Sequence, residues 1–256
     1  MTTATATTTR EALVLEGIVK RFGSVTALRG ASVTARTGEI TAIVGDNGAG
    51  KSTLIKCLTG VHHPDEGRIA VDGEEVHFHS PQDSRKAGIE AVYQDLALAD
   101  DLAVWQNLFL NREKTRGVGP FRVLDRRAMR READHIVRNL SVNVPPVRSR
   151  VRRLSGGQRQ AVAICRAAGF GSRIVIMDEP TAALGHRETH RAEELIAGLR
   201  DRGLAVLLIS HDFAQVQRLA QRVYVMRGGR VTATLGRDEI SPERLVALVT
   251  GAEEDE

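Results

Sequence analysis

The sequence predicts an α/β fold whose central sheet is mostly parallel, with an antiparallel β subdomain and an inserted helical subdomain. Three continuous apolar runs are typical of central strands that are buried on both faces. These runs are Ile40–Val44, Ile174–Met177 and Ala205–Ile209. A helical pattern follows each run, and this alternation favours a wound α/β core. The helical patterns lie at Lys51–Leu58, at Arg187–Leu199, and at Phe213, Val216 and Leu219.

Two hairpin patterns bracket this core. Between Gly67 and Phe78, apolar residues alternate around Asp72-Gly73, a dipeptide favoured in tight two-residue turns. The segment Val223–Thr234 repeats the pattern around Gly228-Gly229. We therefore expect an antiparallel hairpin near each end, and short strands over the opening third of the chain.

The middle of the chain, from about 95 to 166, has a helical pattern with few strand signals. It is interrupted at Gly117, Gly119, Pro120 and Pro145-Pro146. Asp125 is placed to cap a helix that runs to Leu140. We therefore expect a mobile N-terminal tail, a core in two segments, a helical subdomain inserted into one domain, and an acidic C-terminal tail. Their limits are 1–10 for the first tail, 11–94 and 167–250 for the core, 95–166 for the helical subdomain and 251–256 for the acidic tail.

Composition excludes several classes of protein. With 42% apolar residues and 24 glycines in 256 residues, the chain has a globular composition, which rules out a disordered or fibrous protein. Cys57 and Cys165 stand far apart in no metal-ligand spacing, which favours a reducing compartment over a disulfide framework. No apolar run approaches the ~20 residues that span a bilayer, and we expect no signal peptide. Any membrane role therefore requires a partner.

Basic residues are unevenly placed along the chain, whose net charge is +4. Arginines greatly outnumber acidic residues between 112 and 153. Such a segment suits a phosphate backbone, anionic lipid headgroups or an acidic protein surface. The alternative is a solvated helical face.

A glycine-rich loop connects the first apolar run to the first helical pattern. Its residues are Gly45, Asp46, Asn47, Gly48, Ala49, Gly50, Lys51, Ser52 and Thr53. A polyphosphate needs converging backbone N–H donors, and the chain bends tightly enough to supply them only where Cβ atoms are missing. The N-terminus of the following helix points its positive dipole end at the same anions. The lysine is placed to reach the terminal phosphates and Ser52 to ligate Mg²⁺. The alternative is an ordinary glycine turn, but the position between strand and helix favours a nucleoside triphosphate site and a P-loop NTPase core.

Two carboxylates follow the apolar run Ile174–Met177. Asp178 and Glu179 therefore stand at the mouth of a buried strand, where ligands gather in such sheets. Asp178 would hold Mg²⁺, directly or through water. Glu179 would orient and deprotonate the attacking water, because a general base must lie within hydrogen-bond reach of it and glutamate has the longer side chain. Exposed strand ends often carry acidic residues, so this pair alone is weak evidence for a metal site. The phosphate loop in the same chain strengthens that interpretation.

The pentapeptide Leu154-Ser155-Gly156-Gly157-Gln158 matches the signature of the ATP-binding-cassette (ABC) ATPases, which the chain resembles over nearly its whole length and in the family's order. The resemblance implies that Phe22 stacks on adenine, although a core aromatic is the alternative. It implies that Gln94 contacts Mg²⁺ and water and couples to a membrane partner. It also implies that Asp178 holds the metal, Glu179 is the catalytic base and His211 contacts the terminal phosphate.

The signature suggests a two-chain site. Ser155, Gly156 and Gly157 begin an Ala-rich helix, which makes a second anion-binding helix end in which Ser155, Gly156, Gly157 and Gln158 would bind the nucleotide. One chain cannot easily aim both helix ends at one triphosphate if they lie on separate subdomains. The resemblance implies a head-to-tail pair in which each signature completes the other copy's site. A homodimer is the simplest partner cassette.

One departure from the family's pattern is Gly185, which follows Pro180–Leu184 where most members have an aspartate. That departure puts coupling of the two sites by this carboxylate in doubt. The loop Glu179–Gly185 is similar to that of bacterial sugar importers of the ribose, xylose and fructose type. The resemblance implies an ATPase subunit on the cytoplasmic face of the membrane. ATP and Mg²⁺ would be its cofactors. Its partners would be a transmembrane permease and, indirectly, an extracytoplasmic sugar-binding protein. The transported molecule would be a monosaccharide or small polyol.

Two alternatives belong to other classes. An exporter cassette is the nearer one, and only the loops of the sugar-importer type argue against it. A soluble nucleic-acid-processing ATPase would place the basic segment on a phosphate backbone. We expect no nucleic acid partner, because relatives of that kind usually carry two cassettes, long coiled coils or zinc insertions.

Overall fold

The computed structural model describes residues 9–117, 121–140, 142 and 144–252. Most of each predicted tail lies outside the described residues, as do Gly119 and Pro120. Contacts between Cα atoms group the chain into two compact units. The first unit comprises 1–91, 172–179 and 196–256, and the second comprises 92–171 and 180–195. The predicted limits of the helical subdomain, 95–166, stay a prediction.

The first unit is built on a six-stranded sheet with the order β12-β11-β3-β10-β9-β6. Its strands are β3 (Ile40–Val44), β6 (Ile89–Val92), β9 (Ile174–Asp178), β10 (Ala205–Ile209), β11 (Arg222–Arg227) and β12 (Arg230–Gly236). Strand β10 runs parallel to β3 and β9, and β11 runs parallel to β3, while β12 returns antiparallel to β11. The three apolar runs are therefore central parallel strands, and the α/β prediction is confirmed.

A second, antiparallel sheet of the same unit has the order β2-β1-β4-β5. Its strands are β1 (Glu11–Phe22), β2 (Val25–Arg36), β4 (Glu66–Val71) and β5 (Glu74–Glu75). The hairpin at Asp72-Gly73 is present, with both residues at positive φ as a tight turn requires. However, β1 and β2 are long, and bulges interrupt their pairing. Short strands were predicted there because the alternation of apolar and polar residues breaks at each bulge.

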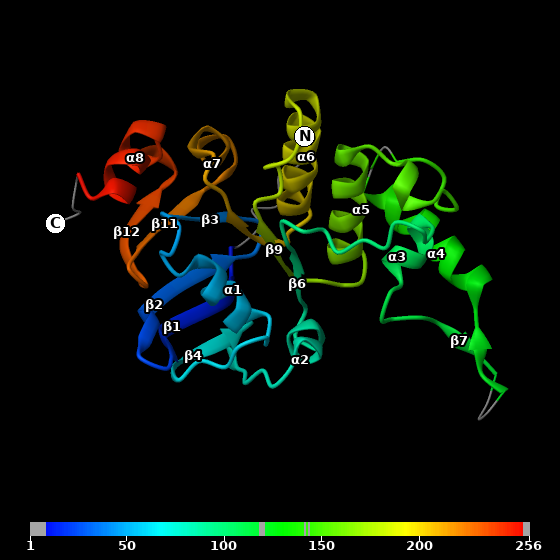
Figure 1. Ribbon diagram of the computed structural model, residues 1–256, viewed down its shortest axis with the longest axis horizontal. Helices are drawn as coiled ribbons and strands as arrows, with labels where there is room; N and C mark the ends of the chain where they lie inside the picture. Colours follow the sequence, from blue (N-terminus) through cyan, green and yellow to red (C-terminus); the bar gives the residue numbers. More distant parts are fainter. Residues whose placement is uncertain (1–8, 118–120, 141, 143, 253–256) are drawn as a thin grey trace, which may run out of the picture. The chain divides into compact units, whose positions relative to one another are not determined.

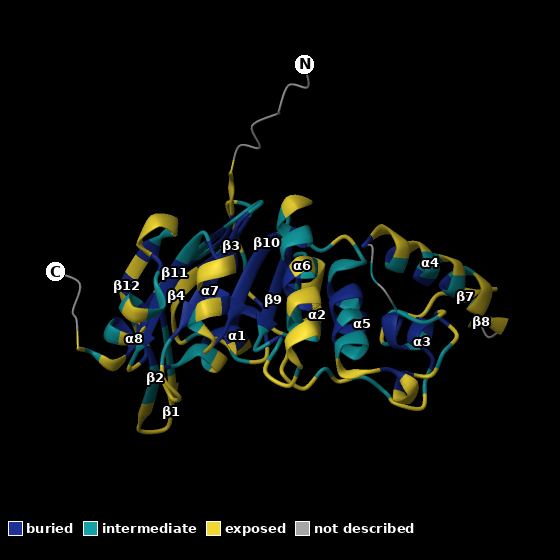
Figure 2. Ribbon diagram, turned by 90° about the horizontal axis from the view of Figure 1, so that it is seen from above, coloured by how far each residue is buried: buried dark blue, intermediate teal, exposed yellow. Residues whose placement is uncertain are grey.

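The faces of the six-stranded sheet pack into two apolar layers because side chains alternate along each strand. On β3, Ile43 packs towards the antiparallel sheet and α1 (Lys51–Leu58), whereas Ala42 and Val44 pack in the layer that holds α7 (Phe213–Leu219) and α8 (Pro242–Thr250). Figure 2 shows β3, β9 and β10 in dark blue, as buried strands. Figure 1 labels β3 and β9 together with α7 and α8.

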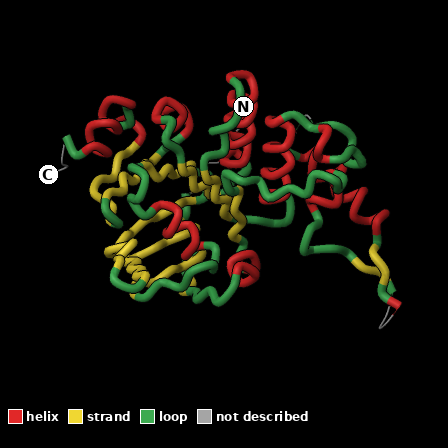
Figure 3. Tube along the Cα trace, in the orientation of Figure 1, coloured by secondary structure: helices red, strands yellow, loops and turns green. Residues whose placement is uncertain are grey.

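The second unit is mainly helical, as Figure 3 shows in red. It contains α3 (Val104–Leu108), α4 (Arg126–Asn139), the 3₁₀ turn Val151–Arg153 and α5 (Gly156–Ala168), together with the first part of α6 (His186–Asp201). Asp125 caps α4, since its carboxylate accepts a hydrogen bond from Ala128 N–H at 3.0 Å. Unlike the prediction, the segment also holds a small hairpin of β7 (Thr115–Arg116) and β8 (Val123–Leu124). Strands of two residues are too short to give a readable alternation.

A further short helix, α2 (Pro81–Lys86), belongs to the first unit. Among the described residues, no helix is both long enough and apolar enough to span a bilayer.

The central strand β10 gives a test of this core. Leu207 is fully buried between β3 and β9, so Leu207→Ala would leave a cavity and lower the free energy of unfolding by about 2–5 kcal/mol. Val246→Ala on α8, where the side chain is 48% exposed, should change it by less than about 1 kcal/mol. Urea unfolding of both variants measures the difference. Equal losses would contradict the placement of β10.

Candidate functional site

The loop between β3 and α1 bends in a way that only glycine permits. Gly45, Gly48 and Gly50 all have φ between 86° and 150°. A Cβ on Gly45 would stand 2.2 Å from the carbonyl oxygen of Met226, and one on Gly50 would stand 2.9 Å from that of Ala27. These close approaches explain the glycine spacing physically. Gly50 is also the N-cap of α1, and no side chain caps that helix end.

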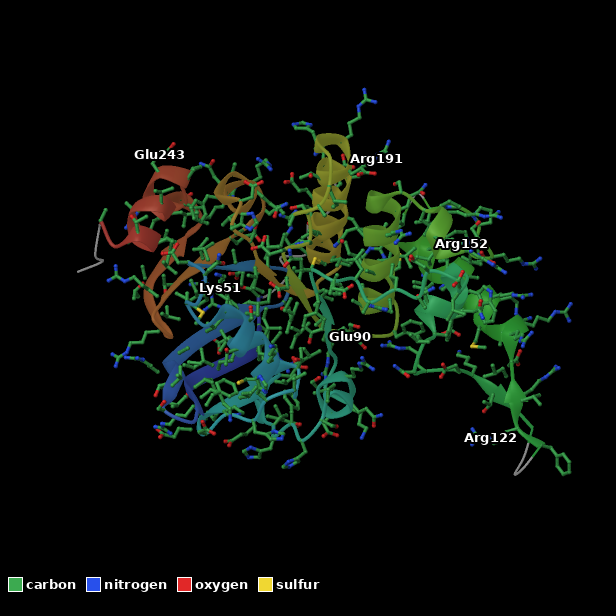
Figure 4. All side chains as sticks on the ribbon, in the orientation of Figure 1. Lys51, Glu90, Arg122, Arg152, Arg191 and Glu243 are labelled. Carbon is green, nitrogen blue, oxygen red and sulfur yellow. The ribbon has the colours of Figure 1, made fainter. Side chains whose placement is uncertain are left out.

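Lys51 is the first residue of α1 and folds back over the loop. Its Nζ donates to the carbonyl oxygens of Gly45 at 2.5 Å and Asp46 at 2.9 Å. Burial lowers the pKa of Lys51, and the carboxylates of Glu179, Asp178 and Asp46 oppose that shift. Figure 4 labels Lys51 beside α1. The lysine thus brings a partly desolvated positive charge to the loop.

A support for this loop was missed by sequence reasoning. Gly229 donates its N–H to Ala49 O at 3.0 Å and accepts from Arg29 N–H at 2.8 Å. A Cβ on Gly229 would stand 2.6 Å from Ala27 O. The turn of the second hairpin therefore ties the phosphate loop to β2. The Gly228-Gly229 pattern indicated a turn, and nothing in it indicated this contact.

The two carboxylates stand at the end of β9, in line with the ends of β10 and β3. Ile209 pairs with Asp178 on one side and with Ile43 on the other. Glu179 follows with its N–H bonded to Ile209 O at 2.9 Å. Its φ of 51° is unusual for a residue with a side chain and is held by this surrounding structure.

Burial raises the pKa of Asp178, the neighbouring Glu179 raises it further, and Lys51 opposes the shift. Burial and a neighbouring negative charge make the ionised carboxylate less favourable, which raises its pKa, and a nearby cation has the opposite effect. A bound Mg²⁺ ion would attract the ionised carboxylate and so offset the unfavourable effects of burial and of Glu179. Asp178 therefore has the chemistry of a metal ligand.

His211 follows β10 and contacts the predicted base directly. Its Nδ1 lies 2.7 Å from a carboxylate oxygen of Glu179. The Glu179 side chain is 16% exposed and that of His211 is 72% exposed. With its proton on this nitrogen, His211 donates a hydrogen bond to the carboxylate. Sequence reasoning brought both residues to the site but did not predict their mutual contact.

These residues fit a magnesium triphosphate. Open space lies beside Gly48, and the N-terminus of α1, which no side chain caps, supplies N–H donors. Ser52 is exposed in the first turn, and with Asp178 it offers the oxygen ligands that Mg²⁺ prefers. In the described ranges no three His, Cys, Asp or Glu side chains cluster as metal ligands. A protein cage is not needed, because Mg²⁺ in such sites is usually held by one or two carboxylates and by substrate phosphates.

Phe22 ends β1 and is 44% exposed, so it is not a core aromatic. The ring meets that of His62 edge to face, with centroids 5.1 Å apart, and Lys20 Nζ lies 5.6 Å from its centroid. Lys20 is itself held by Asp65 at 2.9 Å. An exposed ring on a fixed support is available for stacking against a flat base.

The pentapeptide begins α5 in the second unit. Ser155 is the N-cap: its Oγ accepts from Gln158 N–H at 3.3 Å, and Gln158 Oε1 accepts from Ser155 N–H at 3.0 Å. This reciprocal pair is a capping box, which explains serine and glutamine at this spacing. Ser155 and Gly156 are exposed. The predicted second anion-binding helix end is therefore a real helix N-terminus.

The second unit adds residues that the sequence did not single out. Ser155 Oγ lies 3.0 Å from Glu188 Oε1, at the start of α6. Asn107 is fully buried and bonds the backbone of Ala99 through both its amide groups. Arg166 of α5 donates to the carbonyls of Leu96 and Ala97. The contacts of Asn107 and Arg166 hold the loop after Gln94, whereas that of Ser155 joins α5 to α6. No local sequence pattern indicated them.

Gln94 is exposed in that loop and belongs to the second unit. Within the first unit, the structure thus brings together Lys51, Asp178, Glu179 and His211. The roles of Gln94 and of Ser155–Gln158 towards a nucleotide stay predictions.

Comparisons with known proteins agree with this geometry. The family described as ABC transporter matches residues 28–182. The chain is 47% identical to the fructose import ATP-binding protein FrcA of Rhizobium meliloti, covering 94% of this chain and 95% of that protein. It is 42% identical to the xylose/arabinose import ATP-binding protein XylG of Sulfolobus acidocaldarius, covering 93% of each. A ribose import ATP-binding protein of Rubrobacter xylanophilus is 43% identical over 93% of this chain, which spans 47% of that relative's length.

Solved structures share the fold. A nucleotide-free ATP-binding cassette from an ABC transporter superposes with a TM-score of 0.81 at 28% identity, covering 93% of this chain and 95% of that one. The ADP conformation of the cassette MJ1267 also gives 0.81, at 29% identity, covering 94% and 99%. With the phosphate loop, the carboxylate strand and the pentapeptide in their places, the chain belongs to the ABC transporter family, as one of its ATP-binding cassette ATPases.

Proposed function

We propose that this chain powers the import of a monosaccharide or a related small polyol through a membrane permease. The observation that carries the proposal is the 47% and 42% identity to fructose and xylose/arabinose import ATP-binding proteins over nearly their whole lengths. Because the match extends beyond the nucleotide loops, it supports a shared transport role as well as shared hydrolysis. An exporter cassette is not favoured by any of these relatives.

The chemistry we propose begins with ATP at the phosphate loop. The N–H groups of the loop and of α1 and the charge of Lys51 would bind the phosphates, while Phe22 stacks on the adenine. Ser52, Asp178 and Gln94 would hold Mg²⁺, which neutralises charge on the phosphates when bound. Glu179 would take the proton of the attacking water, and His211, 2.7 Å away, would orient that carboxylate.

We infer that two copies are needed for a complete site. The pentapeptide presents an exposed serine and an exposed helix N-terminus, which is suited to an anion supplied by another copy. Hydrolysis would then separate the copies. The helical subdomain, which we propose spans 95–166, would pass this movement from Gln94 to the permease. The subunit would lie on the cytoplasmic face of the membrane. An extracytoplasmic sugar-binding protein would contact the permease and not this subunit.

Lys51→Ala tests the phosphate loop. Loss of a charge-assisted contact to phosphate should weaken ATP binding at least tenfold, because such contacts contribute about 1.5–3 kcal/mol. Titration calorimetry with ATP measures the loss. The matched control is Lys56→Ala, an exposed lysine on the same helix α1, whose affinity should be that of the parent. An unchanged affinity of the Lys51 variant would remove it from the site.

Glu179→Gln tests the base. The variant should keep ATP binding but lower turnover by about 10²–10⁴, or roughly 3–5 kcal/mol, since a neutral amide cannot accept the proton. Phosphate release in steady state measures the rate. Glu243→Gln, an exposed residue of α8 labelled in Figure 4, should keep full activity. Normal turnover of the Glu179 variant would assign the base elsewhere.

Reconstitution tests the transport role. The subunit should co-purify with a permease and drive ATP-dependent uptake of one or a few monosaccharides in vesicles. Uptake should vanish when the Lys51→Ala subunit replaces the parent, because the driving reaction is lost. If the complex moves no member of a sugar panel while hydrolysing ATP normally, the proposed cargo is wrong. Hydrolysis stimulated by DNA or RNA would favour the soluble alternative.

A further inference from the structure

The carboxylate of Glu188 lies at the N-terminus of the signature helix. It accepts a hydrogen bond from Ser155 Oγ at 3.0 Å. This bond, a second from the backbone N–H of Gly157 and a third from that of Gly185 lower the pKa of Glu188, with the charge of Arg191 adding to the shift. The helix dipole of α5 favours a negative charge at the same place. Figures 1 and 2 both show α5 and α6 side by side.

The glycines of the pentapeptide make room for this arm. A Cβ on Gly157 would stand 3.0 Å from both Cβ and Cγ of Glu188. A Cβ on Gly156 would stand 3.7 Å from one of its carboxylate oxygens. The glycines therefore leave space for the side chain of Glu188 from the same chain, as well as for a phosphate from another copy. The sequence of the pentapeptide does not show which of these two anions its glycines accommodate.

We propose that Glu188 is an internal competitor of the γ-phosphate: it holds the donors of the signature until the phosphate of the opposite copy displaces it. The inference rests on the proposed two-copy site. A serine hydroxyl has one proton to donate, so Ser155 cannot serve Glu188 and a phosphate oxygen together. Two anions at one helix end also repel each other. Closure of the pair must therefore break the contact between Ser155 and Glu188.

A second role of Glu188 determines which variant tests this. Glu188 is the third residue of α6, and its bond from Gly185 N–H is that of a capping box. Glutamine also serves at this position of a capping box, so Glu188→Gln keeps the cap of α6 while removing the charge. A bond from Ser155 to a neutral amide is about half as strong as one to a carboxylate. The variant should release the signature more easily and leave the helix intact.

The experiment measures closure in the hydrolysis-deficient Glu179→Gln protein, with ATP and Mg²⁺ titrated and dimer followed by light scattering. Adding Glu188→Gln should lower the ATP concentration for half-maximal dimer about three- to tenfold. The melting temperature without nucleotide should stay unchanged. The matched control is Glu194→Gln, which removes the same charge from an exposed position on α6 that faces His190; its midpoint should be that of the Glu179→Gln protein.

Two results would overturn the inference while leaving the two-copy site in place: a midpoint that does not move, and one that rises. The first would make Glu188 a helix cap only, and the second would make it a residue that positions Ser155 for the phosphate. A third result is separate. If the Glu179→Gln protein binds ATP but stays monomeric at every concentration, the two-copy site is wrong, and the competitor role falls with it. Glu188→Ala, which also removes the cap, should lower the midpoint together with the melting temperature.

Discussion

The alignment of parallel strand ends is the constraint on which the rest of the site depends. Because β3, β10 and β9 pair in register, Ile43, Ile209 and Asp178 reach one edge of the sheet together. The phosphate loop leaves from one strand, the carboxylates from another and His211 from the strand between them. Main-chain hydrogen bonds thus set the distances between the groups that we propose act on one nucleotide, and apolar layers pack on both faces of the sheet.

Close approach of backbone to backbone is the second recurring device. Gly45 lies against the carbonyl of Met226, and Gly50 and Gly229 both lie against that of Ala27. The glycine-rich loop between β3 and α1 is therefore held by contacts with β2 and with the turn before β12. A loop held in this way loses little conformational freedom when it binds, which makes binding tighter for the same contacts. Glu179 is held in a similar way: its backbone has a positive φ, and its N–H is bonded to Ile209 O on the neighbouring strand.

The N-termini of α1 and α5 are the two helix ends that we propose bind phosphate, and each has different contacts within the chain. At the start of α1 the neighbouring positive charge, Lys51, is turned onto the carbonyls of its own loop. At the start of α5 the helix end already holds an anion, the carboxylate of Glu188. Each site is thus satisfied from within the chain. Binding of a nucleotide then exchanges one set of contacts for another, so the net affinity is smaller than the sum of the new contacts.

The sequence alone determined the central parallel strands and the helices that follow them, the phosphate loop, the carboxylate pair and the pentapeptide. These are local patterns: β3, β10 and α1 have the predicted limits because apolar runs and glycine spacing depend only on neighbours in the chain. Only the tertiary structure decided what joins them. The contact of His211 with Glu179, the support by Gly229 and the arm of Glu188 connect residues tens of positions apart. The physical reason is that such contacts depend on strand register and on the space left beside a glycine, and neither is written in any single segment.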